Sequence, residues 1–393
     1  MKLLEYQAKE RFTSAGLAVP AGRLARTPDE AAAAAAELGR IAVKAQVPIG
    51  GRGKAGGIAV VDTPDDARRE AQRILSMQIR GYPVRRVWCE TALAIDSELY
   101  LGVTLDRDQR RMVIIFSAAG GMEIEQVAAE TPDRIAKLWP DPFAGPQPFE
   151  IRRLAFDALS HAPEHRERAG KLASSLVNVT TRLYSLASSL DALTCEINPL
   201  ALTPDGLLVA ADGKLEIDEN AEYRHRDVAE ELAREDAGAE VTGEDPFEVE
   251  ARKRGLTYVH LDGYVGCIGN GAGLTMNTLD LVKQHGGEPA DFLDIGGGAS
   301  AERVRNALEM VLLDPKVRGV FINVFGGITR GDEVARGVIA ARDELNITKP
   351  LVVRMTGTRE EEGRRLLHEA GIVPATSATE AADKIVQLTR DAA

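Results

Sequence analysis

Cysteine and long apolar runs are both scarce in this chain. Only 3 of its 393 residues are cysteine, and Cys89, Cys195 and Cys267 lie far apart with no Cys-x-x-Cys spacing. That spacing excludes a cysteine zinc site and is typical of a protein in a reducing compartment. The chain has no apolar run of about 18 residues, and its first residues alternate charged with apolar side chains. We therefore predict a cytoplasmic protein with no membrane partner.

Basic residues are also in deficit. The chain has 48 Lys and Arg against 60 Asp and Glu, which gives a formal net charge of −12. An acidic surface disfavours nucleic acid as a partner, and Arg85-Arg86 and Arg110-Arg111 are isolated pairs. Charged residues at 27% and hydrophobic residues at 44% are typical of a globular protein, which excludes a disordered or fibrous chain. At roughly 150 residues per domain, the length predicts two or three domains.

The first half of the chain mixes short strands, hairpins and helices. Thr27-Pro28-Asp29-Glu30 is a capping box with proline at the first helical position. Two further Thr-Pro-Asp sequences, at Thr63 and Thr131, repeat this helix-start signal. Alternating apolar residues over 98–106 and 110–118 predict a hairpin.

A linker and a second half with a stricter pattern follow. Residues 236–246, which are polar and acidic with glycine and proline, are the predicted linker. After it, short apolar runs alternate with helical periods, which indicates a doubly wound parallel sheet. Ligands of such sheets bind beyond the carboxyl ends of the strands. Three glycine-rich turns lie at those ends, namely Gly269-Asn270-Gly271-Ala272-Gly273, Gly296-Gly297-Gly298 and Gly326-Gly327-Ile328-Thr329-Arg330-Gly331.

The densest glycine cluster, Gly50-Gly51-Arg52-Gly53-Lys54-Ala55-Gly56-Gly57, lies between two predicted strands. It matches the dinucleotide fingerprint by letter, but a strand follows it instead of a helix, and Ala55 replaces the hydroxyl residue of a Walker loop. Its amides and cations suit triphosphate oxygens, and a ligand-free mobile hairpin is the alternative. Lys44, in the apolar strand before it, either pairs with an anion or points to solvent.

A second predicted hairpin joins strands 194–202 and 207–214. With its loop centred on Asp205, Asn198 and Asp212 lie opposite each other, and their Cβ atoms are about 5 Å apart. An amide oxygen and a carboxylate suit Mg²⁺, which takes a few hard oxygen ligands together with waters and substrate phosphates. A hydrogen-bonded Asn–Asp pair on a solvated sheet is the alternative.

Further candidate residues lie at the strand ends of the second half. Asn270 precedes a helix whose N-terminal amides could hold an anion, and Gly326-Gly327-Ile328 would direct another helix N-terminus to the same edge. Tight turns alone would also require these glycines. None of the 6 histidines pairs with a nucleophile or has metal-like spacing, so we predict that all are surface or capping residues.

Together these segments resemble the β-subunit family of succinyl-CoA synthetase, also called succinate–CoA ligase, from end to end. The resemblance implies an α/β fold, with an ATP-grasp domain at 1–235 that contains a smaller subdomain at about 21–97, and a flavodoxin-like CoA-ligase domain with a doubly wound parallel sheet at 247–393. The motifs that carry it are Leu4-Glu5-Tyr6-Gln7-Ala8-Lys9, the glycine cluster, Glu98-Leu99-Tyr100-Leu101-Gly102, Glu196-Ile197-Asn198-Pro199-Leu200, Asp212-Gly213-Lys214, Asn270-Gly271-Ala272-Gly273, His285-Gly286-Gly287-Glu288-Pro289-Ala290, Asp294-Ile295-Gly296-Gly297-Gly298 and Phe325-Gly326-Gly327-Ile328.

The resemblance also implies roles for particular residues. Glu196 would be a catalytic residue near a phosphohistidine, and Asn198 and Asp212 would hold one Mg²⁺ per subunit. The organic acid or its phosphate would contact Asn270, Gly326, Gly327 and Ile328. The nucleotide, ATP or ADP, would be held by Lys44, Gly51, Arg52, Gly53, Glu90, the backbone of Leu93, and Glu98.

The implied reaction is the reversible conversion of ATP, succinate and CoA to ADP, phosphate and succinyl-CoA. In this family the phosphorylated histidine and most of the CoA site belong to an α subunit, in an αβ or α2β2 assembly. That agrees with the lack of a catalytic-looking histidine here. A malate–CoA ligase subunit and a non-catalytic nucleotide-sensing module are the alternatives. The hypothesis of a dehydrogenase is supported only by the letter match of the glycine cluster to the dinucleotide fingerprint. We expect adenine to be preferred over guanine.

Overall fold

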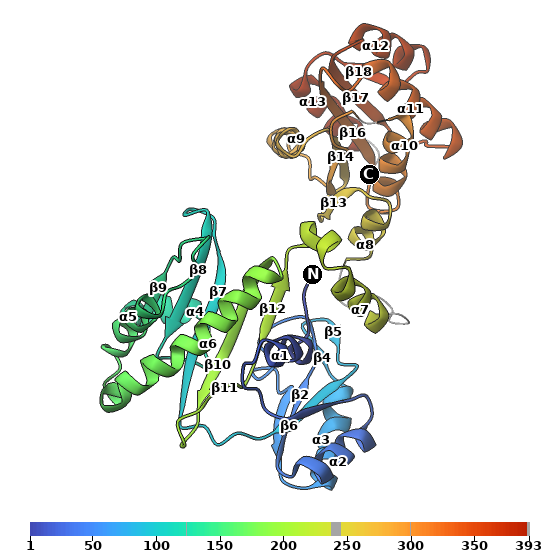
Figure 1. The fold of residues 1–393 in the computed structure, drawn as a ribbon. Coiled ribbons are helices and arrows are strands. Elements are labelled where there is room, and N and C mark those ends of the chain that lie inside the picture. Colours follow the sequence, from blue (N-terminus) through green and yellow to red (C-terminus); the bar gives the residue numbers. More distant parts are fainter. Residues whose placement is uncertain (123, 237–244, 299, 391–393) are drawn as a thin grey trace. The chain divides into compact units, whose positions relative to one another are not determined.

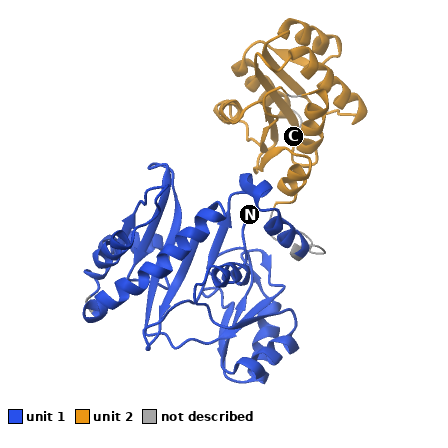
Figure 2. Ribbon diagram, viewed as in Figure 1, with its two compact units in different colours: residues 1–243 blue, residues 244–393 orange. Residues whose placement is uncertain are grey.

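The computed structural model covers residues 1–393 and describes all of them except 123, 237–244, 299 and 391–393. The chain forms two compact units, residues 1–243 and 244–393 (Figure 2). Most of the predicted linker 236–246 lies outside the described residues. Helix α8 (Pro246–Lys253) begins at its end.

A small four-stranded antiparallel sheet carries the glycine cluster of unit 1. Its strand order is β1-β6-β2-β3, and the apolar faces of helices α2 and α3 pack on it (Figure 1). The elements are β1 (Gly22–Ala25), α2 (Pro28–Leu38), β2 (Ile41–Ala45), β3 (Ile58–Val61), α3 (Pro64–Leu75) and β6 (Val87–Thr91), with a separate two-stranded pair formed by β4 (Gln78–Ile79) and β5 (Tyr82–Pro83).

Two of the three predicted helix starts are confirmed. The hydroxyl groups of Thr27 and Thr63 accept the N–H groups of Glu30 and Asp66, which caps α2 and α3. The helix predicted after Thr131 is wrong, because only a single 3-10 turn follows it. Both the N–H and the hydroxyl of Thr131 bond back to the carbonyl oxygen of Val127, so this residue ends a helix instead of starting one.

The second sheet of unit 1 has six strands and pairs antiparallel throughout. Its order is β11-β10-β7-β8-β9, and β12 also pairs with β10. The long helix α6 packs on it (Figure 1). The elements are α1 (Glu5–Ser14), β7 (Ser97–Asp106), β8 (Arg111–Ser117), α4 (Ile124–Glu130), η1 (Pro132–Arg134), β9 (Ile135–Leu138), α5 (Pro148–Leu159), η2 (Pro163–Arg168), α6 (Ala169–Ser189), β10 (Ala192–Leu202), β11 (Leu208–Ala210), β12 (Lys214–Ile217), η3 (Glu219–Arg224) and α7 (Arg226–Asp236).

Both predicted hairpins are confirmed. β7 pairs with β8 along its length, and β10 pairs with β11 and then β12 along one edge. Leu200 lies opposite Ala210, and Glu196 lies opposite Lys214. Both pairs are symmetric about Asp205, as predicted.

Unit 2 is a doubly wound sheet with the order β13-β15-β14-β16-β17-β18. All neighbouring strands are parallel except β13, which pairs antiparallel with β15. The strand order therefore reverses direction between β14 and β16, which is where such sheets bind ligands. The elements after α8 are β13 (Thr257–His260), β14 (Val265–Gly269), α9 (Ala272–Gln284), β15 (Asp291–Asp294), α10 (Ala301–Leu312), β16 (Gly319–Gly326), α11 (Gly331–Glu344), β17 (Leu351–Gly357), α12 (Glu360–Glu369), β18 (Val373–Ala375) and α13 (Ala378–Arg390).

Each face of this sheet has its own core. Helices α10, α11 and α12 bury apolar side chains on one face, and α9 and α13 do so on the other. The apolar runs at 264–268, 292–295, 320–325, 351–355 and 372–374 predicted every strand of this sheet except the short β13. Among the described residues, no helix combines the length and the apolar character that crossing a membrane requires.

Helices α10 and α11 approach closely at Gly337. A Cβ atom at this position would lie 2.7 Å from the carbonyl oxygen of Ala301 and 3.1 Å from the Cβ of Val304. Gly→Ala inside a helix normally stabilises by about 0.5–1 kcal/mol, but overpacking costs about 1–3 kcal/mol. We predict that Gly337→Ala destabilises unit 2, measured by hydrogen exchange of its amides in urea. Gly170→Ala in α6, where a Cβ meets no atom within 4 Å, should not destabilise unit 1. Equal stability of Gly337→Ala and the wild type would contradict this packing.

His260 ties α8 to the sheet of unit 2. Its Nδ1 lies 2.6 Å from Oδ2 of Asp245, the residue that caps α8, and its Nε2 lies 3.2 Å from Oδ2 of Asp314. Phe247 packs against the imidazole, with the ring centroids 4.7 Å apart. Burial lowers the pKa of His260, but the two carboxylates outweigh it and raise the pKa above its ordinary value.

A raised histidine pKa predicts a pH-dependent stability. The contribution of His260 is complete below its unfolded pKa of about 6.5 and is lost as pH rises through the higher folded pKa. Between about pH 6 and pH 9, unit 2 of the wild type should therefore lose more stability than His260→Gln does. Hydrogen exchange at the two pH values measures the difference. His285→Gln is the control, because the His285 ring contacts the main-chain oxygen of Leu281 instead. Parallel losses in wild type and His260→Gln would refute the assignment.

Candidate active site

The glycine cluster forms a folded turn between β2 and β3. The N–H of Gly57 donates to the oxygen of Arg52 at 2.9 Å, and the oxygen of Gly57 accepts the N–H of Ala45 at 2.7 Å. Gly51 has a φ of 80°, a conformation that L side chains rarely adopt. This turn buries the Arg52 side chain, which is 8% exposed, while Lys54 remains exposed. The strand that follows the loop confirms that this is not a dinucleotide fingerprint.

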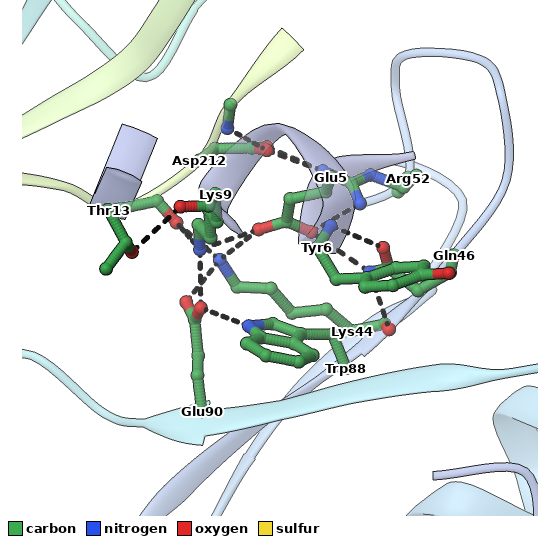
Figure 3. A network of polar contacts seen from close by, with 12 residues as sticks. Glu5, Tyr6, Lys9, Thr13, Lys44, Gln46, Arg52, Trp88, Glu90 and Asp212 are labelled. Carbon is green, nitrogen blue, oxygen red and sulfur yellow. Dashed lines mark hydrogen bonds and ion pairs between the residues drawn. The ribbon is translucent and has the colours of Figure 1, made fainter. Parts of the chain in front are cut away.

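Arg52 and five other charged side chains form a cluster that we call the charge network (Figure 3). It contains three carboxylates and three cations, so its formal charges balance. The members are Glu5 and Lys9 of α1, Lys44 of β2, Arg52 of the glycine turn, Glu90 of β6, and Asp212 between β11 and β12.

Lys44 is buried in this network and does not point to solvent. Its Nζ lies 2.7 Å from Oε1 of Glu90 and 3.1 Å from Oε1 of Glu5, and it donates to the oxygen of Ala211 at 2.6 Å. Burial lowers the pKa of Lys44, but the charges of Glu5 and Glu90 outweigh it and raise the pKa above its ordinary value. The ammonium group is therefore held charged.

Arg52 joins the network to Asp212. Its Nη2 donates to both carboxylate oxygens of Asp212, at 2.7 and 2.8 Å, and its Nη1 donates to Glu5. Burial lowers the pKa of Arg52, but Glu5 and Asp212 outweigh it. Such charge-assisted hydrogen bonds are about twice as strong as neutral ones. The structure thus brings together four residues that the sequence analysis assigned to nucleotide or metal, namely Lys44, Arg52, Glu90 and Asp212.

Glu5 and Lys9 are functional candidates that the sequence analysis missed. Lys9 contacts Glu5 at 2.8 Å, forms an ion pair with Glu90, and donates to the oxygen of Ala211 at 2.8 Å. The side chains of Glu5 and Lys9 are each 1% exposed. A signal was present in the sequence, because both residues belong to the motif Leu4-Glu5-Tyr6-Gln7-Ala8-Lys9 that opens the chain.

Glu98 and Asn198 come together at the loop that follows β8. A Cβ atom at Gly121 would lie 1.9 Å from Oε2 of Glu98, so this loop requires glycine where it crosses Glu98. The N–H of Gly121 donates to Oδ1 of Asn198 at 2.9 Å, and the amide of Asn198 donates to the oxygen of Met122 at 2.9 Å. Leu93, half-buried, lies in the segment between β6 and β7 that joins the two sheets of unit 1.

The chemistry of Asn198 and Asp212 fits Mg²⁺. The strand register is symmetric about Asp205 on both sides of them, at Leu200–Ala210 and at Glu196–Lys214, which agrees with the predicted pairing. An amide oxygen and a carboxylate are hard donors, and two of them leave coordination positions for phosphate oxygens and waters. The described residues contain no group of three or more His, Cys, Asp or Glu side chains that could hold a metal alone.

Glu196 lies two residues before Asn198 on β10 and is half-buried. Burial raises its pKa; Lys214 lowers it, while the charges of Glu125 and Asp212 raise it. Burial raises the pKa of the Tyr100 hydroxyl, and the charge of Glu196 raises it further. Glu196 thus lies close enough to the candidate metal ligand Asp212 for their charges to interact.

In unit 2, the candidate residues meet at the point where the strand order reverses. The amide of Asn270, after β14, donates to the oxygen of Phe325 at 2.8 Å and accepts the N–H of Phe325 at 2.8 Å. It thereby holds the start of the turn after β16. Gly326 has a φ of 132°, the oxygen of Gly327 accepts the hydroxyl of Thr358, and Ile328 is 84% exposed.

Comparisons with known proteins agree with this architecture. An ATP-grasp domain family matches residues 2–202, and a CoA-ligase family matches residues 268–387. The ATP citrate lyase of Methanothrix soehngenii has the same fold, with a TM-score of 0.69 at 17% identity over 99% of both chains. The chain is thus an ATP-grasp protein with a CoA-ligase unit, and the α/β fold class implied by the resemblance is confirmed.

Curated relatives define the family more closely. The chain is 49% identical to the succinate–CoA ligase [GDP-forming] subunit beta of Thermus thermophilus over 100% of both chains. It is 45% identical to the [ADP-forming] subunit beta of a Roseiflexus species, over 98% of this chain and 99% of the relative. It is also 45% identical to that of Geobacillus kaustophilus, over 99% and 100%. The chain belongs to the succinate–CoA ligase β-subunit family.

The two cations of the glycine turn should differ in their effect on stability. Arg52→Ala removes one of the three cations that contact Glu5 and the cationic partner of Asp212, and breaking such a buried pair costs about 3–5 kcal/mol. The exposed Lys54→Ala should change the free energy of unfolding by less than about 0.5 kcal/mol. Both tryptophans, Trp88 and Trp139, lie in unit 1, so their fluorescence in urea follows its unfolding. Equal losses for the two variants would show that Arg52 is not part of a buried network.

Proposed function

We propose that this chain is the nucleotide-binding β subunit of a succinate–CoA ligase. It would catalyse the reversible reaction of ATP, succinate and CoA to ADP, phosphate and succinyl-CoA, together with an α subunit that carries a phosphohistidine. The observation that carries the proposal is the charge network, in which Lys44, Arg52 and Asp212 converge in a member of this family that matches a relative along its whole length. A non-catalytic sensing module would not need the cations and the candidate metal ligand together.

In the proposed mechanism, unit 1 positions the nucleotide and stabilises its charge. Phosphoryl transfer depends mainly on positioning and electrostatics, and little on covalent help from the protein. Lys44 and Arg52 would contact phosphate oxygens, with the amides of Gly51 and Gly53 beside them. Glu90, Glu98 and the backbone of Leu93 would complete the nucleotide site. Mg²⁺, bound by Asn198 and Asp212, would supply further charge neutralisation when present.

Two further groups of residues would act on the phosphoryl group and the acid. Glu196 would lie beside the partner's phosphohistidine when that residue receives or delivers the phosphoryl group. In unit 2, Asn270 and Gly326-Gly327-Ile328 would contact the organic acid or its phosphate. The helix α11 that follows this turn would add the positive end of its dipole.

The finer assignments within this function are also proposals. Succinate is the acid named for the relatives, and a malate–CoA ligase is the alternative. Relatives include both ADP-forming and GDP-forming subunits, and we propose adenine as the preferred base. The α-subunit partner is supported by the subunit names of the relatives, in an αβ or α2β2 assembly. A cytoplasmic location is supported by three free, buried cysteines.

The test uses tagged protein purified gently from its own cells, with whatever chain co-purifies. With Mg²⁺ and γ-labelled ATP, we expect an acid-labile label on a separate, smaller chain. Succinate plus CoA should discharge that label faster than malate plus CoA. Excess unlabelled ATP should compete better than GTP.

Asp212→Ala should reduce this labelling by at least about 100-fold, because the transition state loses metal-borne charge neutralisation. Tryptophan fluorescence would confirm that the variant is folded. A co-purifying partner that never takes label would favour the sensing module. Full labelling of Asp212→Ala would remove the metal assignment.

A further inference from the structure

Glu5 is the centre of the charge network, although its position in the sequence alone gave it no role. It is the first residue of helix α1, and its side chain is 1% exposed. Oε1 contacts Nζ of Lys9 at 2.8 Å and Nζ of Lys44 at 3.1 Å. Oε2 accepts from Nη1 of Arg52 and, at 3.1 Å, from Nε2 of Gln46. One carboxylate therefore holds both proposed phosphate-binding cations, each through a different oxygen (Figure 3).

The Glu5 carboxylate stays ionised in spite of its burial. Burial raises the pKa of Glu5, but Arg52, Lys44 and Lys9 outweigh it and hold the pKa well below its ordinary value. A buried carboxylate with four hydrogen-bonding partners has little freedom to move. The Glu5 carboxylate can therefore hold the side chains of Lys44 and Arg52 in fixed positions.

The side chains of the charge network become more exposed to solvent from Glu5 to Asp212. Side-chain exposure is 1% at Glu5, 4% at Glu90, 8% at Arg52, 10% at Lys44 and 29% at Asp212. A ligand from solvent would reach Asp212, Lys44 and Arg52 before it reached Glu5. The bond from Arg52 to Asp212 is therefore the accessible one, and the bond from Arg52 to Glu5 lies behind it.

Binding of a metal–phosphate ligand would replace the ion pair between Arg52 and Asp212. Asp212 accepts Nη2 of Arg52 through both of its oxygens, so a metal at Asp212 would compete with the guanidinium for this carboxylate. Arg52 would then need a new anion on that side, and a nucleotide phosphate supplies one. Glu5 would keep its bond to Nη1 throughout, so Arg52 would keep its place while its partner changed.

We infer that Glu5 is a positioning residue, which holds Lys44 and Arg52 from behind and keeps them directed at the phosphates when Asp212 leaves Arg52. It acts through these two cations and does not touch the ligand. This inference rests on the proposed nucleotide site, and it adds the residue on which the alignment of that site depends.

The test measures Mg·ADP binding to the purified full-length protein by calorimetry. Glu5→Gln should raise the Kd by about 10-fold or more, because it removes the negative charge that holds Lys44 and Arg52. In the complex with the co-purifying smaller chain, the KM for CoA should not change. Glu231→Gln is the matched control, since Glu231 also anchors α1, through Arg11 and Gln7, but lies outside the network. It should bind Mg·ADP as the wild type does.

A double-mutant cycle separates positioning from general stability. If Glu5 acts through Arg52, adding Glu5→Gln to Arg52→Gln should raise the Kd by less than about 3-fold further. The double variant also restores the balance of buried charge. If Glu5→Gln does not fold, Glu5→Asp carries the test, because it keeps the charge but its shorter side chain cannot reach both cations. Its Kd should rise by about 3-fold or more.

The outcomes separate this inference from the proposed function. A wild type that does not bind Mg·ADP would refute the nucleotide site itself. A wild type that binds, with a folded Glu5→Gln or Glu5→Asp of equal Kd, would overturn only the role of Glu5. Fully additive effects of Glu5→Gln and Arg52→Gln would also overturn it.

Discussion

The neutralisation of buried charge by opposite charge is the interaction on which unit 1 depends. Three carboxylates and three cations lie largely out of water, where any one of them alone would be costly. They come from helix α1, both central strands of the small sheet, the glycine turn and the β11–β12 connection. The same ion pairs therefore join the two sheets of unit 1 and arrange the proposed phosphate site, so stability and function share one set of contacts.

Local patterns predicted the elements well, and the exceptions have physical causes. The alternation of strands and helices in unit 2 appears directly in the sequence because parallel strands are apolar and helices are amphipathic. Thr131 has the same local signal as Thr27 and Thr63, yet its hydroxyl bonds to a preceding helix. The four-residue β13 alternates exposed and buried positions over too short a length to stand out.

The residues of the candidate site also divide into those that local sequence patterns predicted and those that such patterns missed. The glycine cluster indicated Arg52, and the symmetry of a hairpin about Asp205 indicated Asn198 and Asp212, because both signals are local in the chain. Glu5 and Lys9 could not be found by spacing, since their partners lie up to 202 residues away in the chain. Arg52 and Lys54 were equivalent in the sequence, and only the fold of the turn shows that one is buried and the other exposed.

Helix α1 has a consequence for synthesis of the protein. The first residues of the chain pair with the last strand of the six-stranded sheet, since the N–H of Leu3 donates to the oxygen of Leu215 and the N–H of Ile217 donates to the oxygen of Met1. Glu5 and Lys9 leave the ribosome first, yet Asp212 and the oxygen of Ala211 emerge some 200 residues later. The contacts of the N-terminal segment with β12 and with Ala211 can therefore form only after β12 has been translated, whereas those of Glu5 and Lys9 with Lys44, Arg52 and Glu90 involve residues that emerge earlier.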